Sequence, residues 1–265
     1  MFEKSFMKNG NTAIVSFSAI VLFFGVWQVG VVLFQVDHWV LPSPSSIIQS
    51  LWSSRDLLFM HTIQTLGESV IGLFFSVVVG SGLAFLMEFF PLSKRSIYPF
   101  IIFSQTIPVI ALAPLLIIWF GYGMLSKIIL ITMVCFFPIV ISMIDGFAMV
   151  DPEWLRLVKT MGANRLQTFR LVKLPAVLPS FFSGFRIAGA YCVLGAVISE
   201  WLGAEKGLGI FLIRCAKSYM TERVFATIFV ISILSLAVVC FIEVIAHVIM
   251  PWHFRKNLYQ YTKTT

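Results

Sequence analysis

Charged residues are scarce in this sequence. Only 12% of the 265 residues are Asp, Glu, Lys or Arg, whereas a typical soluble domain carries about 25%. Hydrophobic residues make up 59% of the chain. This composition leaves too few polar side chains to cover a globule in water, so it excludes an ordinary soluble domain. We expect lipid to be the solvent for much of the surface.

Residue patterns typical of enzymes and metal sites are missing as well. The four cysteines show no CxxC spacing and the histidines no ligand spacing, so we expect no metal, disulfide framework or cofactor. Neither a GxxxxGK[ST] phosphate loop nor an HExxH or Ser–His arrangement occurs, so the chain is expected neither to hydrolyse ATP nor to be a membrane enzyme. The net charge of +7 is not gathered into a basic cluster with aromatics, so nucleic acid is not an expected partner.

Long apolar runs divide the sequence into about six stretches, each long enough for a span of roughly 20 residues. Lys4 and Lys8 precede the first run, as in a cleaved signal peptide. However, the charge-free length of 9–36 exceeds a signal core of about 7–15 residues, and no Ala-x-Ala site follows. We therefore predict an all-α integral membrane protein with a single transmembrane domain over 1–265 and spans at about 12–34, 63–89, 96–120, 127–148, 182–202 and 224–248.

Two of these spans carry residues that predict how they pack or bend. In the second span, small residues recur at every fourth position and predict close approach of another helix: Gly72, Ser76, Gly80 and Ala84. The third span contains Pro108 and Pro114, and we expect it to bend at both. Between the first two spans, Leu41-Pro42-Ser43-Pro44-Ser45 cannot continue a helix, and Ser45 or Ser46 is a candidate cap for a short surface helix.

The distribution of basic residues predicts the orientation in the membrane. With a cytoplasmic N-terminus, thirteen of the nineteen Lys and Arg residues fall on the cytoplasmic side, at 4, 8, 94, 95, 156, 159, 165, 170, 173, 186, 255, 256 and 263. Cytoplasmic loops of membrane proteins carry such an excess of positive charge. We therefore expect both termini to lie in the cytoplasm.

The long cytoplasmic loop at 149–181 has the sequence of two short helices. Asp151-Pro152-Glu153 is a typical helix start, with Asp as the N-cap and Pro in the first turn. Trp154, Leu155, Val158 and Met161 are expected to share one face, and Gly162 to end the helix in a left-handed conformation. Asn164 and Gln167 can cap a second helix, and Pro175 and Pro179 mark the return to the membrane. The residues alone leave two interpretations open: a rigid knob outside the bilayer, or a helix lying on the lipid surface.

The same loop resembles the signature of ABC importer permeases, the binding-protein-dependent transport inner-membrane components. In that signature a glycine is followed by nine residues, an aliphatic residue, any residue and Leu-Pro. Here Gly162 is followed after nine residues by Val172-Lys173-Leu174-Pro175. The resemblance is to the branch for nitrate, sulfonate, taurine and thiamine-precursor pyrimidines, and it extends over about 40–250 through Leu41-Pro42-Ser43-Pro44, residues 108–115 with Trp119-Phe120-Gly121, Glu200-Trp201-Leu202-Gly203-Ala204 and Gly207-Leu208-Gly209.

This resemblance implies a type I ABC importer transmembrane-domain fold in a bacterial inner membrane. It also implies three protein partners: a separate ATPase subunit, an extracytoplasmic solute-binding protein and a second permease copy, giving a homodimer. The family's Glu-Ala-Ala triplet is replaced here by Arg156-Leu157-Val158. The residues that the resemblance assigns to ATPase coupling are Arg156, Lys159, Gly162, Ala163, Arg165 and Leu166.

A second group of candidates lies within the spans. Ser104 and Gln105, just before the Pro108 bend, are interpreted either as substrate contacts or as hydrogen bonds between helices. Glu200 either caps the fifth span or faces a polar pathway. A narrow face of small residues on the same span is interpreted either as a seam that moves during transport or as a static contact within one subunit: Gly184, Ala188, Cys192 and Ala196.

Two alternatives to an ABC importer remain: a secondary transporter, or another polytopic membrane protein with an amphipathic cytoplasmic loop. A secondary transporter usually shows inverted repeats and ionisable residues at mid-membrane, and neither is clear here. The sequence leaves the substrate open among sulfonate, taurine, nitrate and thiamine-precursor pyrimidine classes. As an ABC importer permease, the chain would work by alternating access and would carry out no chemical reaction itself.

Overall fold

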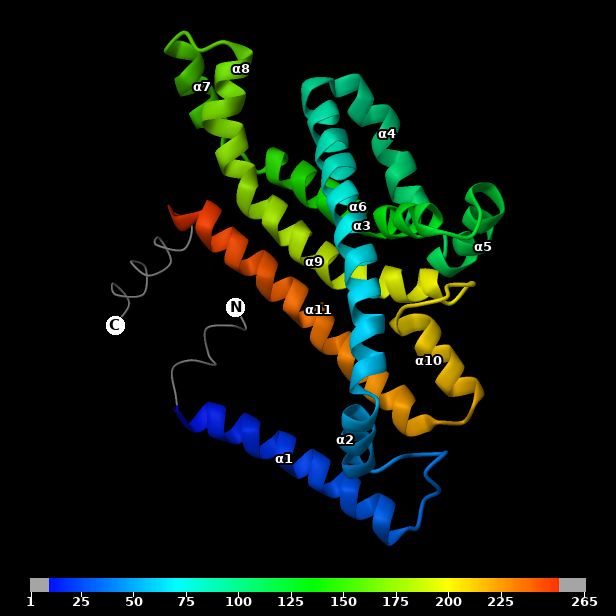
Figure 1. Ribbon diagram of the computed structural model, residues 1–265. Helices are drawn as coiled ribbons and strands as arrows, with labels where there is room; N and C mark the ends of the chain where they lie inside the picture. The colour runs from blue at the N-terminus through cyan, green and yellow to red at the C-terminus, as the bar shows by residue number, and fades with distance from the viewer. Residues whose placement is uncertain (1–9, 253–265) are drawn as a thin grey trace. The chain divides into compact units, whose positions relative to one another are not determined.

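The computed structural model describes residues 10–252, and every regular element in this range is a helix (Figure 1). The all-α class predicted from composition is confirmed. Five helical stretches of the described chain are long and apolar enough to cross a bilayer: Val15–Leu33, Arg55–Phe89, Met124–Ala148, Arg165–Glu200 and Thr221–Ile249. A bent pair of helices adds a sixth if the two count as one span.

The chain divides into two compact units. The first unit holds the residues up to 60 together with 211–230. It contains α1 (Gly10–Leu33), α2 (Pro44–Ser53), most of α10 (Leu208–Lys217) and the first turns of α11 (Thr221–Ile249). The second unit holds 61–210 and the residues from 231 onward, and it carries most of the polar contacts considered below.

In the first unit, the connection between α1 and α2 is fixed by side-chain contacts. Ser43, rather than the expected Ser45 or Ser46, caps α2 and accepts a hydrogen bond from the Ser46 amide at 3.3 Å. Pro44 then fills the first helical position, where a residue without an N–H loses nothing. The Gln28 side chain of α1 accepts a hydrogen bond from the Ser45 amide at 3.1 Å, and the Trp27 ring lies 5.8 Å from that of Phe225 on α11.

The core of the second unit is built on α6 (Met124–Ala148), which packs against α3 (Arg55–Phe89) and α9 (Leu174–Glu200). Glycine makes the approach of α3 possible, because a Cβ at Gly72 would overlap the Ile131 side chain and one at Gly80 would lie 3.1 Å from Ile139. Ser76, between these glycines, is fully buried. The predicted close approach of another helix to this small-residue stripe is therefore observed, and the partner helix is α6.

The third predicted span, 96–120, is broken into α4 (Pro91–Ser104) and α5 (Val109–Phe120), which meet at an angle of 101°. The break lies at the expected Pro108, whose backbone is extended and which lacks an N–H to continue the helix. Pro114 lies inside α5 and does not end it. A single sharp break at 105–108 thus replaces the two bends expected from the sequence.

The return from the loop to the membrane is also different from the expectation. Pro175 and Pro179 do not interrupt it, because α8 (Arg165–Thr168), the π-helical turn η1 (Phe169–Lys173) and α9 follow one another without a gap. Pro175 falls in the first turn of α9, where a missing N–H costs little. The span predicted at 182–202 is therefore the second half of a 36-residue helical run that begins at Arg165.

Candidate functional site

The predicted loop folds into two short helices joined at a glycine corner, and we call residues 151–168 the α7–α8 knob. In α7 (Pro152–Thr160) the Asp151 side chain accepts a hydrogen bond from the Glu153 amide at 2.8 Å. Gly162 has φ +82°, the left-handed conformation that glycine adopts without steric cost. The predicted cap and the predicted helix stop are both confirmed.

The start of α8 is a complete capping box, as the sequence predicts. The Asn164 side chain accepts from the Gln167 amide and the Gln167 side chain accepts from the Asn164 amide, each at 2.8 Å. Directly after it, the Phe169 ring lies 4.7 Å from Phe89 of α3 and 6.1 Å from Phe147 of α6. These ring contacts attach the α7–α8 knob to the ends of two membrane helices.

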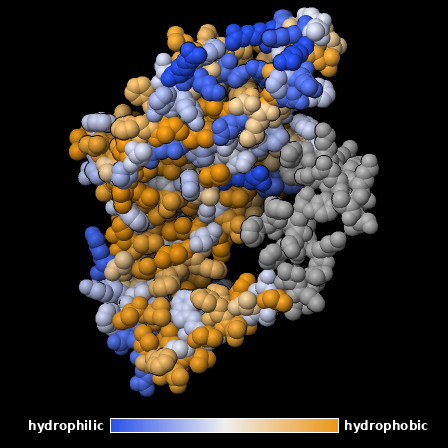
Figure 2. Space-filling view, turned by 180° about the vertical axis from the view of Figure 1, so that it is seen from behind, coloured by the Kyte–Doolittle hydropathy of each residue, from blue (hydrophilic) through white to orange (hydrophobic). Residues whose placement is uncertain are grey.

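One face of α7 leaves large apolar side chains exposed. Trp154 is 61% exposed, Leu157 53% and Met161 77%. The sequence placed Leu155 and Val158 on this face, but both are half-buried toward the rest of the chain, and Leu157 takes their place. Figure 2 shows that hydrophilic side chains gather over the end of the unit that carries α7 and α8, next to a broad hydrophobic surface. The exposed apolar face of α7 thus lies in polar surroundings.

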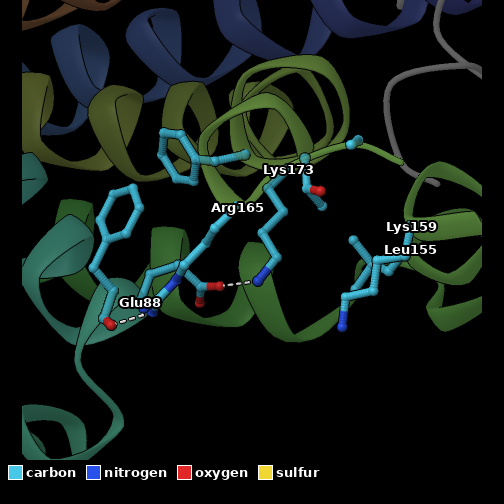
Figure 3. Close-up of a pocket in the computed structure, with 9 residues that line it drawn as sticks. Glu88, Leu155, Lys159, Arg165 and Lys173 are labelled. Carbon is cyan, nitrogen blue, oxygen red and sulfur yellow. Dashed lines mark hydrogen bonds and ion pairs between the residues drawn. The ribbon is translucent and has the colours of Figure 1, made fainter. Parts of the chain in front are cut away.

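The six residues assigned to coupling lie on this knob, but they do not form one surface. Arg156, Lys159, Arg165 and Leu166 are all exposed. Of the six, only Lys159, Ala163 and Arg165 line a pocket between α7, α8 and the end of α3 (Figure 3). Sequence reasoning missed the other charged residues of this pocket, Glu88 and Lys173, which form an ion pair. Neither local spacing nor a motif connects two residues that lie in different helices 85 positions apart.

Glu200, at the other end of α9, is fully buried and accepts two hydrogen bonds. The Thr65 hydroxyl donates to one carboxylate oxygen at 2.7 Å and the Gly209 amide to the other at 2.5 Å. Thr65 in turn accepts from the Leu208 amide at 2.8 Å. Glu200, the last residue of α9, therefore ties α3 and the 201–209 loop to the end of that helix.

The glycines of the 207–209 motif are required by the same contact. Gly207 has φ +132°, and a Cβ there would overlap the Glu200 carboxylate. A Cβ at Gly209 would overlap the carbonyl oxygen of Val197. The buried His61 accepts from the Gly207 amide at 2.9 Å. The Glu200 and Gly207-Leu208-Gly209 motifs, separate in the sequence, thus form one structural unit.

A second buried carboxylate, that of Glu68, lies on α3 about one turn after Thr65. Glu68 is 0% exposed and pairs with Lys127 at 2.6 Å, while the Gln64 side chain donates to the same oxygen at 2.8 Å. The nearby Lys127 and Gln64 groups offset part of the cost of burying this carboxyl group. The sequence shows Glu68 and Lys127 only as single charges at the ends of apolar runs, and it does not pair them.

The small-residue face of α9 is in contact with α6 of the same chain. A Cβ at Gly184 would overlap the Pro138 carbonyl oxygen, and the Cys135 thiol lies 3.4 Å from the Ala188 carbonyl oxygen. Ala188, Cys192 and Ala196 have no exposed surface. The contact seen for this face therefore lies within one subunit, between α9 and α6.

Ser104 and Gln105 lie at the break between α4 and α5. The Ser104 hydroxyl is half-buried and donates to the Ile101 carbonyl of its own helix at 2.9 Å, and Gln105 is exposed. Within residues 10–252, neither residue forms a hydrogen bond with Glu200 or with the small-residue face of α9.

Helical spans, a broken helix pair and a capped knob together define a polytopic membrane transport component. The chain matches the family described as binding-protein-dependent transport system inner membrane component over residues 72–250, and it belongs to that family. It is 38% identical to the formylaminopyrimidine transport permease protein ThiX of Halalkalibacterium halodurans, over 86% of this chain and 91% of that protein. It is 28% identical to the taurine transport system permease protein TauC of Escherichia coli, over 90% of each.

The fold is similar to solved transporter structures. The inward-facing MetNI methionine ABC transporter matches with a TM-score of 0.60 at 18% identity, over 72% of this chain and 97% of that one. An amino acid ABC transporter matches with a TM-score of 0.58 at 16% identity, over 76% and 96%. The protein is therefore a multi-pass inner-membrane permease subunit of an ABC importer with the type I transmembrane fold.

Proposed function

We propose that this permease subunit couples to a separate ATPase subunit through the exposed face of α7. Three large apolar side chains on that face, Trp154, Leu157 and Met161, carry the proposal, because exposed apolar groups on a polar surface mark a contact site. The left-handed Gly162 and the capped start of α8 hold that face rigidly. Its polar surroundings favour a protein groove over the lipid surface (Figure 2).

The proposed orientation places the α7–α8 knob and both termini in the cytoplasm. Thirteen of the nineteen Lys and Arg residues then lie on the cytoplasmic side. ATP is supplied from that side, so the docking face and the energy source coincide. An extracytoplasmic binding protein would load the opposite face, and a second copy of the chain would complete the pathway.

The proposed substrate is a small polar pyrimidine of the kind that supplies thiamine synthesis. Support comes from the 38% identity to a formylaminopyrimidine permease along nearly the whole chain. A sulfonate such as taurine is the second candidate, because the taurine permease TauC is similar over 90% of this chain at 28% identity.

Reconstitution of this chain with its cognate ATPase subunit and binding protein tests both the coupling role and the substrate assignment. ATP hydrolysis and uptake in proteoliposomes should rise with binding protein loaded with formylaminopyrimidine and not with taurine. Stimulation by taurine alone would exclude the pyrimidine assignment. Failure of the ATPase to assemble with this chain at all would exclude the coupling role.

A further inference from the structure

The pocket beside α7 has a volume of about 360 Å³ and an excess of positive charge. Lys159 comes from α7, Arg165 from the start of α8 and Lys173 from η1, and Glu88 of α3 is the only carboxylate among the lining residues. Figure 3 shows Arg165 and Lys173 on either side of Glu88, with Lys159 across the opening from them. Three cationic side chains and one anionic side chain therefore share this pocket.

Only one of the three cations is neutralised. Lys173 is ion-paired with Glu88. The Arg165 guanidinium donates to the Phe89 carbonyl at the end of α3 and lies 5.6 Å from the centre of the Phe89 ring. It is thus oriented, but it forms no ion pair with a carboxylate of residues 10–252. Within residues 10–252, the Lys159 ammonium makes no hydrogen bond or ion pair, and the backbone carbonyl of Lys159 accepts a hydrogen bond from the Gly162 amide. Two uncompensated positive charges thus face a cavity large enough for a tetrahedral anion.

The pocket lies where membrane spans end. Span α3 stops at Phe89, and the run from Arg165 to Glu200 is 36 residues, about 54 Å at 1.5 Å per residue, so it extends beyond a hydrocarbon core of about 30 Å. Large apolar side chains next to the pocket are exposed: Phe90 at 58%, Leu92 at 77% and Leu171 at 67%. A cationic pocket that lies at the ends of membrane spans and is bordered by exposed apolar side chains has the composition of a phospholipid headgroup site.

We infer that this pocket binds a phosphate group and that Lys159 and Arg165 are its principal ligands. The group would neutralise the excess charge and connect α7 to α8 and the end of α3. Its two possible sources are the headgroup of an anionic phospholipid and free inorganic phosphate. The inference goes beyond the proposed docking of the ATPase, because it concerns the side of α7 that faces its own chain.

Native mass spectrometry of the full-length chain tests the lipid source. The protein is reconstituted in nanodiscs that contain equal amounts of phosphatidylglycerol and phosphatidylcholine, then released into mild detergent, and the retained lipids are counted. Wild type should retain phosphatidylglycerol preferentially, and Lys159→Gln should reduce this retention about fivefold, the effect of removing one basic residue near a membrane surface. The Lys159 side chain has no hydrogen-bond or ion-pair partner in the described chain, so this substitution leaves the fold intact.

Two control variants separate the pocket from general charge effects. Lys206→Gln removes an exposed lysine of the 201–209 loop and should retain lipid like wild type. Lys159→Arg keeps the charge and should also retain it. In parallel, thermal unfolding with inorganic phosphate and with chloride at equal ionic strength tests the free-ion source. A rise in melting temperature in wild type that is lost in Lys159→Gln would assign the site to inorganic phosphate.

The inference is overturned by either of two results. One is equal phosphatidylglycerol retention in wild type and Lys159→Gln, with no specific effect of inorganic phosphate. The other is an equal loss in Lys159→Gln and Lys206→Gln, which would show a dependence on net charge alone. Neither readout requires the ATPase or the transport substrate, so a failed coupling assay leaves this test unaffected.

Discussion

Replacing Glu200 by alanine should destabilise the chain strongly. The carboxylate is fully buried and accepts hydrogen bonds from the Thr65 hydroxyl at 2.7 Å and the Gly209 amide at 2.5 Å. Glu200→Ala leaves both donors without that partner in a buried site. Each buried donor left without a partner costs about 1–3 kcal/mol, so the expected loss in unfolding free energy for the two donors is about 2–6 kcal/mol.

Glu200→Gln provides the matched comparison. The amide keeps one oxygen acceptor for the Gly209 amide, which Glu200→Ala removes, whereas in both variants Thr65 can donate to the His61 carbonyl at 3.1 Å. We therefore expect Glu200→Gln to lose less than half as much stability as Glu200→Ala. Glu205→Ala removes an exposed carboxylate from the same loop and should be neutral.

Thermal unfolding of the detergent-solubilised chain, followed by tryptophan fluorescence, is the assay. At about 2–4 °C per kcal/mol, Glu200→Ala should lower the melting temperature by about 4–24 °C. Equal melting temperatures for Glu200→Ala and Glu205→Ala would refute the structural role of Glu200. An equal loss in Glu200→Gln and Glu200→Ala would refute the assignment of the effect to the two hydrogen bonds.

Three further predictions concern the knob, the α6–α9 contact and the orientation. Gly162→Val places a β-branched residue at φ +82° at a cost of about 1 kcal/mol or more; it should leave folded yield intact and reduce co-purification of the ATPase, and normal co-purification would contradict this. Ala188→Leu overpacks a site with no exposed surface and should cost about 1–3 kcal/mol, whereas Ile187→Leu, at a side chain that is 46% exposed, should have a mild effect. In Ala188→Leu, uptake should fall in proportion to the amount of folded protein. A loss of uptake at full yield would instead support a seam that moves during transport. In a background without native cysteines, impermeant reagents outside the cell should label Asp56→Cys and not Asn164→Cys, and outside labelling of the latter would reverse the proposed orientation.

The parts of the structure that depend on neighbouring residues could be predicted from the sequence. The Asp151 cap, the left-handed Gly162 and the Asn164–Gln167 capping box each involve residues within a few positions of one another, so their local chemistry determines the geometry. The apolar length of the spans is likewise a local property, and the break at Pro108 follows from the missing N–H.

The contacts between distant segments could not be predicted in this way. Thr65 and Glu200 are 135 positions apart, and Glu68 and Lys127 are 59 apart, so neither pair leaves a periodic signal. For the same reason the partner of the Gly184 face was open between two interpretations until α6 was seen against it. The exposed face of α7 was only partly predicted, because the position of the chain behind it decides which apolar residues are covered.

The proposal that the exposed face of α7 docks the ATPase subunit is tested most directly by cross-linking. A single cysteine in place of Leu157, in a chain without the native four, should form a cross-link to the assembled ATPase subunit with a short bifunctional reagent. Glu205→Cys, exposed at the opposite end of α9, should not. Cross-linking at position 157 that depends on an assembled complex would confirm that α7 docks the ATPase. An assembled, active complex with no cross-link at position 157, or with equal cross-linking at 205, would contradict it.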